Sequence, residues 1–141
     1  MLKLLDYMEL KEPLRRFAAQ KPVFGTCAGA ILMASDVRNP AQESFGAVDM
    51  TVERNGYGRQ VDSRVAVLHP SDDFMKRAGE GDVEAVFIRA PIIRRTGPGV
   101  KVLAEYAGDP VLVEQGRHLI ATFHPELTAD ARVHKLFLSK P

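Results

Sequence analysis

The sequence contains a single cysteine, Cys27, among its 141 residues. One cysteine excludes an internal disulfide framework, so we expect a cytoplasmic protein whose thiol is free for chemistry. Long hydrophobic runs are also missing, since none approaches the roughly 20 residues that a membrane-spanning helix needs. The first residues lack the long apolar core of a signal peptide. The sequence therefore predicts neither membrane insertion nor secretion.

An excess of charge of either sign is absent as well, because 19 basic residues face 18 acidic ones for a net charge of +1. Such a balance gives no reason to expect a nucleic acid or an anionic membrane as a partner. No group of cysteines and histidines has the spacing of a zinc site, so we expect no metal. What is left is an ordinary globular composition, 45% hydrophobic and 26% charged, of a length that suits one domain.

The periodicity of the apolar residues predicts helices and strands in a single domain, residues 1–141. Helices are expected over residues 2–19, divided at Pro13, over 28–36, and at the end of the chain after a cap at Thr128 or Asp130. Residues 70–83 are polar and are expected to form a surface insertion with one helical turn. Residues 115–117 are expected to form a hairpin between two of the strands. The expected strands are 23–24, 48–52, 61–67, 85–88, 100–106, 111–114 and 118–123. This order predicts an α/β sandwich with a mixed, partly parallel sheet.

The most informative stretch joins the first expected strand to a helix and reads Phe24-Gly25-Thr26-Cys27-Ala28-Gly29. A cysteine with a glycine two residues away on each side, between strand and helix, indicates a nucleophile elbow. Side chains at Gly25 and Gly29 are expected to clash in so sharp a turn. The helix N-terminus is expected to favour the thiolate of Cys27, and the Ala28 N–H to serve as an oxyanion-hole donor. The alternative is that Cys27 is a small core residue.

A candidate base follows the last expected strand, in the sequence His124-Pro125-Glu126. In an extended segment, residues i and i+2 point to the same side, so Glu126 can orient the imidazole of His124 toward Cys27. This set predicts attack on an amide or ester carbonyl with a thioester intermediate. The alternative is that Pro125 only ends a strand, with His124 and Glu126 exposed.

Two arginines and three other histidines are the remaining polar candidates. Arg54 and Arg89 suit the carboxylate of an amino acid, because a guanidinium binds a carboxylate through two parallel hydrogen bonds. They could instead be solvated charges or phosphate ligands. We interpret His69 as structural, and His118 and His134 as surface residues of a strand and a helix.

The elbow together with His124-Pro125-Glu126 resembles the class I (triad) glutamine amidotransferases. Residues 52–63, which read Val-Glu-Arg-Asn-Gly-Tyr-Gly-Arg-Gln-Val-Asp-Ser, with 87–91 and 123–128, narrow the resemblance to the PdxT/SNO family of glutaminase subunits. The resemblance implies a three-layer, flavodoxin-like α/β fold and the hydrolysis of L-glutamine to L-glutamate and ammonia. It also implies the site: Cys27 as nucleophile, His124 as base and acid, Glu126 as its orienter, and Arg54, Ile88 and Arg89 as glutamine-binding residues.

The same resemblance implies a partner and no cofactor. In this family the ammonia passes to a (β/α)₈-barrel synthase subunit, which makes pyridoxal 5′-phosphate (vitamin B6) from it, ribose 5-phosphate and glyceraldehyde 3-phosphate. The glutaminase is nearly inactive until it docks.

The sequence departs from the family at its beginning. Family members start with a strand-helix-strand unit and a Pro-Gly-Gly-Glu-Ser-type loop, about fifty residues in all, which supply the second oxyanion donor. We therefore expect an N-terminally truncated form with unpaired strand edges and exposed apolar surface, and an open reading frame that begins upstream. Two other interpretations stay open: a catalytically impaired docking subunit of the same complex, and another triad amidotransferase or related cysteine hydrolase.

Overall fold

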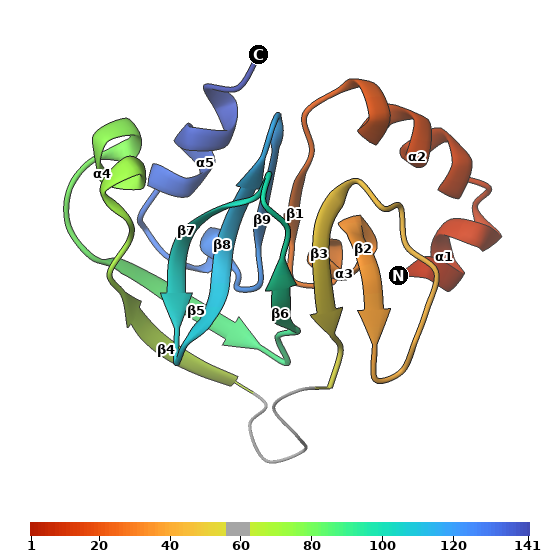
Figure 1. Ribbon diagram of the computed structural model, residues 1–141, viewed down its shortest axis with the longest axis horizontal. Helices are drawn as coiled ribbons and strands as arrows, with labels where there is room; N and C mark the ends of the chain where they lie inside the picture. The colour runs from red at the N-terminus through yellow and green to blue at the C-terminus, as the bar shows by residue number, and fades with distance from the viewer. Residues whose placement is uncertain (56–62) are drawn as a thin grey trace.

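The computed structural model describes residues 1–55 and 63–141, so residues 56–62 of the predicted arginine-containing segment lie outside it (Figure 1). The helices are α1 (Leu2–Tyr7), α2 (Lys11–Gln20), α3 (Ala28–Met33), α4 (Asp72–Ala78) and α5 (Arg132–Leu138), with a 3₁₀ turn at Pro125–Leu127. The strands are β1 (Phe24–Thr26), β2 (Ala34–Arg38), β3 (Val48–Glu53), β4 (Ser63–Leu68), β5 (Val83–Ile88), β6 (Ile92–Thr96), β7 (Lys101–Tyr106), β8 (Asp109–Gln115) and β9 (His118–Ala121).

The strands form three groups, ordered β1-β9-β8-β7, β2-β3-β6 and β4-β5. The pairs β1–β9 and β2–β3 are parallel and the others antiparallel, which confirms the mixed, partly parallel arrangement. Figure 1 shows α4 and α5 on one side of the strands and α1 and α2 on the other. The fold is thus an α/β sandwich, with helices outside and strands within.

Apolar side chains alternate between two cores along the central strands. Leu112 of β8 and Leu119 of β9 belong to one core, which also contains residues of α4 and α5. The next residues, Val113 and Ile120, belong to the other core with residues of α2 and α3. All four residues of β9 are buried, as expected of a strand covered on both faces. The segment that carries His124 therefore leaves from the interior of the sheet.

The region after the elbow differs from the prediction. The helix ends at Met33 instead of residue 36, and β2 begins at the next residue, where Ala34 and Val37 are buried and pair with β3. Strand β6 was also not expected, because Arg94 and Arg95 give it a polar appearance. In the fold these arginines form ion pairs with acidic residues of the neighbouring strand β3. Both segments are strands because they pair with β3, and a local sequence pattern carries no information about that pairing.

The polar stretch 70–83 contains more structure than one helical turn. Ser71 caps α4, since its Oγ accepts a hydrogen bond from the N–H of Phe74 at 3.2 Å. The phenyl ring of Phe74 is fully buried and holds the helix against the core. The predicted hairpin is confirmed, with Gln115 opposite His118 across a two-residue turn. Helix α5 begins after Ala131, and the carboxylate of Asp130 accepts from the N–H of Arg132 at 3.0 Å.

Candidate active site

Cys27 lies between the end of β1 and the start of α3, in a backbone conformation with φ of 51° and ψ of −107°. Positive φ is strained for a residue with a side chain and persists only where the surroundings enforce it. Here the Cys27 N–H donates to the carbonyl of Ala121 at 2.9 Å, and the Cys27 carbonyl accepts from Ala30 N–H at 3.0 Å. The predicted strand-turn-helix elbow is therefore present, and the thiol is half-buried.

The two flanking glycines differ in what they allow. A Cβ on Gly25 would lie 2.9 Å from the carbonyl oxygen of Gly29 and 3.2 Å from Cδ1 of Ile120, which is too close. A Cβ on Gly29 would meet nothing within 4 Å. The expected steric requirement holds at Gly25 and is wrong at Gly29, because only Gly25 faces the backbone of the turn.

His124 follows β9 and is fixed through its backbone and its ring. Its N–H donates to the carbonyl of Val86 on β5 at 2.8 Å. Its Nδ1 lies 2.6 Å from Oε1 of Glu126. Because an ionised carboxylate only accepts hydrogen bonds, Nδ1 carries the proton and Nε2 is left as the basic nitrogen. The expected pair is confirmed, although Pro125–Leu127 is a 3₁₀ turn and not the extended segment we expected.

Parallel pairing brings the cysteine and the histidine to one edge of the sheet. Thr26, the last residue of β1, is opposite Ala121, the last residue of β9. Strand β5 reaches the same place, because the Ile88 carbonyl lies 3.7 Å from Sγ of Cys27 while the Val86 carbonyl holds His124. Three strand ends thus converge, as expected for a site at the carboxyl edge of an α/β sheet.

The electrostatics of the thiol differ from the expectation of a ready thiolate. Burial raises the pKa of the Cys27 thiol above its ordinary value; the Ala28 N–H lowers it, and the negative charge of Glu126 raises it again. Burial opposes ionisation of Glu126, but the hydrogen bond from His124 and nearby positive charge keep the pKa of that carboxyl below its ordinary value. The helix is only six residues long. In this geometry the neutral thiol is favoured.

The predicted glutamine-binding residues lie at or directly after the ends of β3 and β5. Ile88 faces Cys27 through its carbonyl, and Arg89 follows it as an exposed residue with φ of 46°, a second strained position beside the thiol. Arg54 follows β3, and the contact that positions it is a hydrogen bond from its N–H to the Arg38 carbonyl at 3.0 Å. That contact joins Arg54 to β2.

The other histidines make their ring contacts outside this cluster, although the charge of His134 is near enough to help lower the pKa of Glu126. His118 is buried, not on the surface as we expected: its Nδ1 accepts from the Val23 N–H at 3.2 Å, and burial lowers its pKa. His69 is exposed and lies 2.6 Å from Asp82. His134 packs edge-on against Phe24. Within residues 1–55 and 63–141, no three acidic, cysteine or histidine side chains are grouped to hold a metal ion.

Sequence reasoning missed the contribution of β5. The carbonyls of Val86 and Ile88 position His124 and face Cys27, but a carbonyl oxygen is common to all residues and leaves no signal in the sequence. Among residues 1–55 and 63–141, no helix is long and apolar enough to cross a bilayer.

Known proteins resemble this chain over nearly its whole length. The model of the SNO glutamine amidotransferase family matches residues 1–140. The chain belongs to this family. The pyridoxal 5′-phosphate synthase subunit PdxT of Solibacter usitatus (strain Ellin6076) is 68% identical over 99% of this chain and 73% of the relative. The subunit of the same name from Koribacter versatilis (strain Ellin345) is 54% identical over 97% of this chain and 68% of its own.

A solved structure gives the same result for the fold. A crystal structure of a glutamine amidotransferase superposes with a TM-score of 0.81 at 42% identity and covers 96% of this chain and 70% of the other. The resemblance read from the elbow and from residues 52–63, 87–91 and 123–128 is confirmed at the level of the family. The chain is a glutamine amidotransferase with the α/β fold of the class I enzymes.

Proposed function

We propose that this chain hydrolyses L-glutamine to L-glutamate and ammonia, and delivers the ammonia to a pyridoxal 5′-phosphate synthase. The observation that carries this proposal is the register of β1 with β9, which puts Cys27 and the His124–Glu126 pair at one edge of the sheet. Membership of a glutamine amidotransferase family supplies the substrate class. The names of the PdxT relatives support the destination of the ammonia.

The geometry supports the following roles. Nε2 of His124 takes the Cys27 proton as Sγ attacks the carboxamide carbon, which forms a C–S bond and a negatively charged oxygen. The Ala28 N–H stabilises that oxygen. Collapse breaks the C–N bond, with the proton passing from His124 to the departing ammonia. Water then attacks the thioester, again with His124 as base, to give glutamate and the free thiol.

The raised pKa of Cys27 fits this order of proton transfer. A thiol that is neutral before substrate binds keeps its proton until His124 removes it in the attack. Glu126 holds Nδ1 and stabilises the imidazolium that results. Arg54, Ile88 and Arg89 are proposed to bind glutamine, with the arginines suited to its carboxylate. These steps need no cofactor.

The partner is proposed to be the synthase subunit, a (β/α)₈ barrel in this family, in a cytoplasmic complex. Residues 1–141 would act as one glutaminase domain, because the β1–β9 pair joins segments from the two ends of the described chain. The catalytically impaired docking subunit is the less favoured candidate, since Cys27, His124 and Glu126 are all present and His124 and Glu126 are in contact.

The test is ammonia release from L-glutamine by the chain together with a synthase subunit. We expect the wild type to release ammonia and Cys27→Ala to release none, because no other group replaces the thiol. Cys27→Ser is the control that keeps the shape of the side chain, and we expect its rate to be reduced at least about 100-fold because a serine hydroxyl is far less acidic than a thiol. Ammonia from Cys27→Ala equal to that from the wild type would refute the assignment. Absence of ammonia from both proteins would favour the docking subunit.

A further inference from the structure

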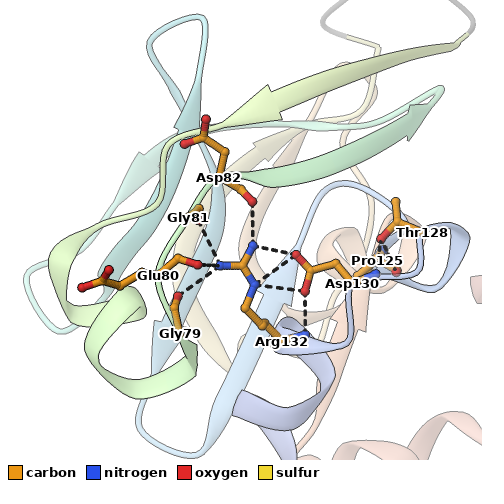
Figure 2. Close-up of polar contacts among 8 residues, drawn as sticks. All are labelled: Gly79, Glu80, Gly81, Asp82, Pro125, Thr128, Asp130 and Arg132. Atoms are coloured by element: carbon orange, nitrogen blue, oxygen red, sulfur yellow. Dashed lines mark hydrogen bonds and ion pairs between the residues drawn. The ribbon is translucent and has the colours of Figure 1, made fainter.

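Arg132, the first residue of α5, has an unusually complete set of hydrogen bonds. Its guanidinium donates to four successive backbone carbonyls, those of residues 79–82, at 3.1, 2.7, 3.0 and 2.6 Å (Figure 2). It also donates to both oxygens of Asp130, the closest at 2.7 Å. The side chain is only 19% exposed, and the guanidinium lies 5.9 Å from the centre of the Phe74 ring.

The backbone conformation of the loop 79–82 lets its carbonyls converge on the Arg132 guanidinium. Gly79 and Gly81 have φ of 116° and 99°, a region that side chains disfavour. These two residues curl the loop so that its carbonyls point at one guanidinium, as Figure 2 shows. Only arginine offers five N–H donors in a planar fork, so lysine cannot reproduce the contact set.

Both partners of Arg132, the loop 79–82 and Asp130, are connected to the candidate active site. The loop 79–82 runs directly into β5, whose Val86 carbonyl holds His124 and whose Ile88 carbonyl faces Cys27. On the other side, the Asp130 N–H donates to Oγ1 of Thr128 at 3.3 Å. Thr128 in turn donates from Oγ1 to the carbonyl of Pro125 at 3.4 Å. Pro125 stands between His124 and Glu126.

We infer that Arg132 is a positioning residue, which fixes the His124–Glu126 segment against β5 and so sets His124 relative to Cys27. It touches neither the thiol nor the imidazole and acts through Asp130, Thr128 and the loop. The inference rests on the proposed function for its meaning in turnover, but its geometry concerns only the placement of His124. The inference predicts that a weakening of the hydrogen bonds of Arg132 displaces His124 while the fold is kept.

The experiment compares Arg132→Lys and Asp130→Asn with Arg77→Lys as the matched control. Arg77 also forms a bidentate ion pair, but its partner Glu114 is on β8 and not on the segment that carries His124. All variants are measured at a temperature where each is fully folded by circular dichroism. With the synthase subunit, we expect kcat to fall about 10- to 100-fold for Arg132→Lys with KM for glutamine little changed, and to stay near wild type for Arg77→Lys.

A second readout needs no turnover. The rate at which iodoacetamide alkylates Cys27 is measured against pH for the wild type, the same variants and His124→Gln. We expect the Arg132→Lys profile to move toward that of His124→Gln, and the Arg77→Lys profile to follow the wild type. If Arg132→Lys lowers only the melting temperature and keeps the wild-type profile, Arg132 is merely structural and the inference is wrong.

The two proposals fail in different ways. Should wild type and synthase together release no ammonia, the proposed function fails while the alkylation profiles still decide the role of Arg132. Identical profiles for the wild type and His124→Gln would overturn the inference itself, because His124 would then not act on Cys27.

Discussion

Cys27 and Arg89, the residue after Ile88, both have positive φ, at 51° and 46°. Each follows the end of a strand, β1 or β5, and the two meet where the Ile88 carbonyl faces Sγ. Strained backbone costs about 1 to 3 kcal/mol per residue and is kept where a precise geometry is required. At Cys27 the strained conformation is held by the hydrogen bond from its N–H to the Ala121 carbonyl of β9.

The glycines of the elbow give a prediction at the scale of single residues. We expect Gly25→Ala to destabilise the protein by about 1 to 3 kcal/mol, because its Cβ would overlap the Gly29 carbonyl. Gly29→Ala is the matched control in the same turn; it lies in α3 with open space around it, and we expect it to be neutral or stabilising by up to about 1 kcal/mol. Urea unfolding of both variants is the measurement. Equal losses of stability would contradict the geometry described for the elbow.

At the scale of elements, the sequence predicted what local patterns encode. The elbow, the hairpin at Gln115 to His118 and the closing helix all have short-range signals, and all are present. Strands β2 and β6 were missed because their strand character comes from pairing with β3, which lies elsewhere in the sequence. The helix predicted over residues 28–36 ends at Met33 for the same reason, because the residues from Ala34 onward pair with β3.

In the candidate site, too, some residues can be identified from local sequence patterns and others cannot. Cys27, His124 and Glu126 could be chosen from residue type and spacing, and the structure puts His124 and Glu126 in contact. The carbonyls of β5 could not be chosen, nor could the role of Arg132, because its partners are backbone oxygens of a distant loop. The expected thiolate was wrong because burial outweighs a very short helix.

The junction of β8, α4 and the end of the chain gives a prediction about pH. Glu114 is buried on β8, and hydrogen bonds from Arg77 and Lys140 outweigh the burial that opposes its charge, so its pKa falls to about 2. A lowered pKa stabilises the fold above the unfolded value of 4.5, and that stability is lost as the pH falls through 2. The difference between these two pKa values of Glu114 corresponds to about 3 kcal/mol of unfolding free energy.

We therefore expect the unfolding free energy of the wild type to drop more steeply than that of Glu114→Gln as the pH is lowered from 5 to 2. The measurement is urea unfolding at several pH values. Glu84→Gln, at an exposed position of β5, serves as the control and should follow the wild type. Parallel curves for the wild type and Glu114→Gln would show that the ion pairs around Glu114 contribute no pH dependence.

At the scale of the whole molecule, apolar surface is distributed unevenly. More than half of the large hydrophobic side chains that are exposed within the described residues belong to the first 17 positions, among them Leu4 at 59% and Tyr7 at 87%. Single exposed apolar residues are common, but a concentration of them on α1 and α2 is unusual for a protein surface. We expect the native protein to bind the dye ANS, which reports accessible apolar surface.

Replacing Leu4 and Tyr7 by glutamine should lower that dye signal while it changes the free energy of unfolding by less than about 1 kcal/mol. Leu5, the buried residue between them at 8% exposure, is the matched control. Leu5→Gln should cost about 2 to 5 kcal/mol, because it removes a packed side chain and buries an amide. If Leu4→Gln and Tyr7→Gln were as destabilising as Leu5→Gln, α1 would be covered in solution and the exposure described for it would be wrong.

The parallel pairing of β1 with β9 has a consequence for the assembly of the site. The hydrogen bond from Val23 to His118 joins positions 95 apart in the sequence, and Cys27 is bonded to Ala121 across a similar span. Closing so long a loop costs entropy before any contact repays it. A nascent chain or a proteolytic fragment that ends before β9 can contain the whole elbow and still have no strand beside it. The active centre is thus a property of the closed chain, and the thiol becomes part of it only when the last strand arrives.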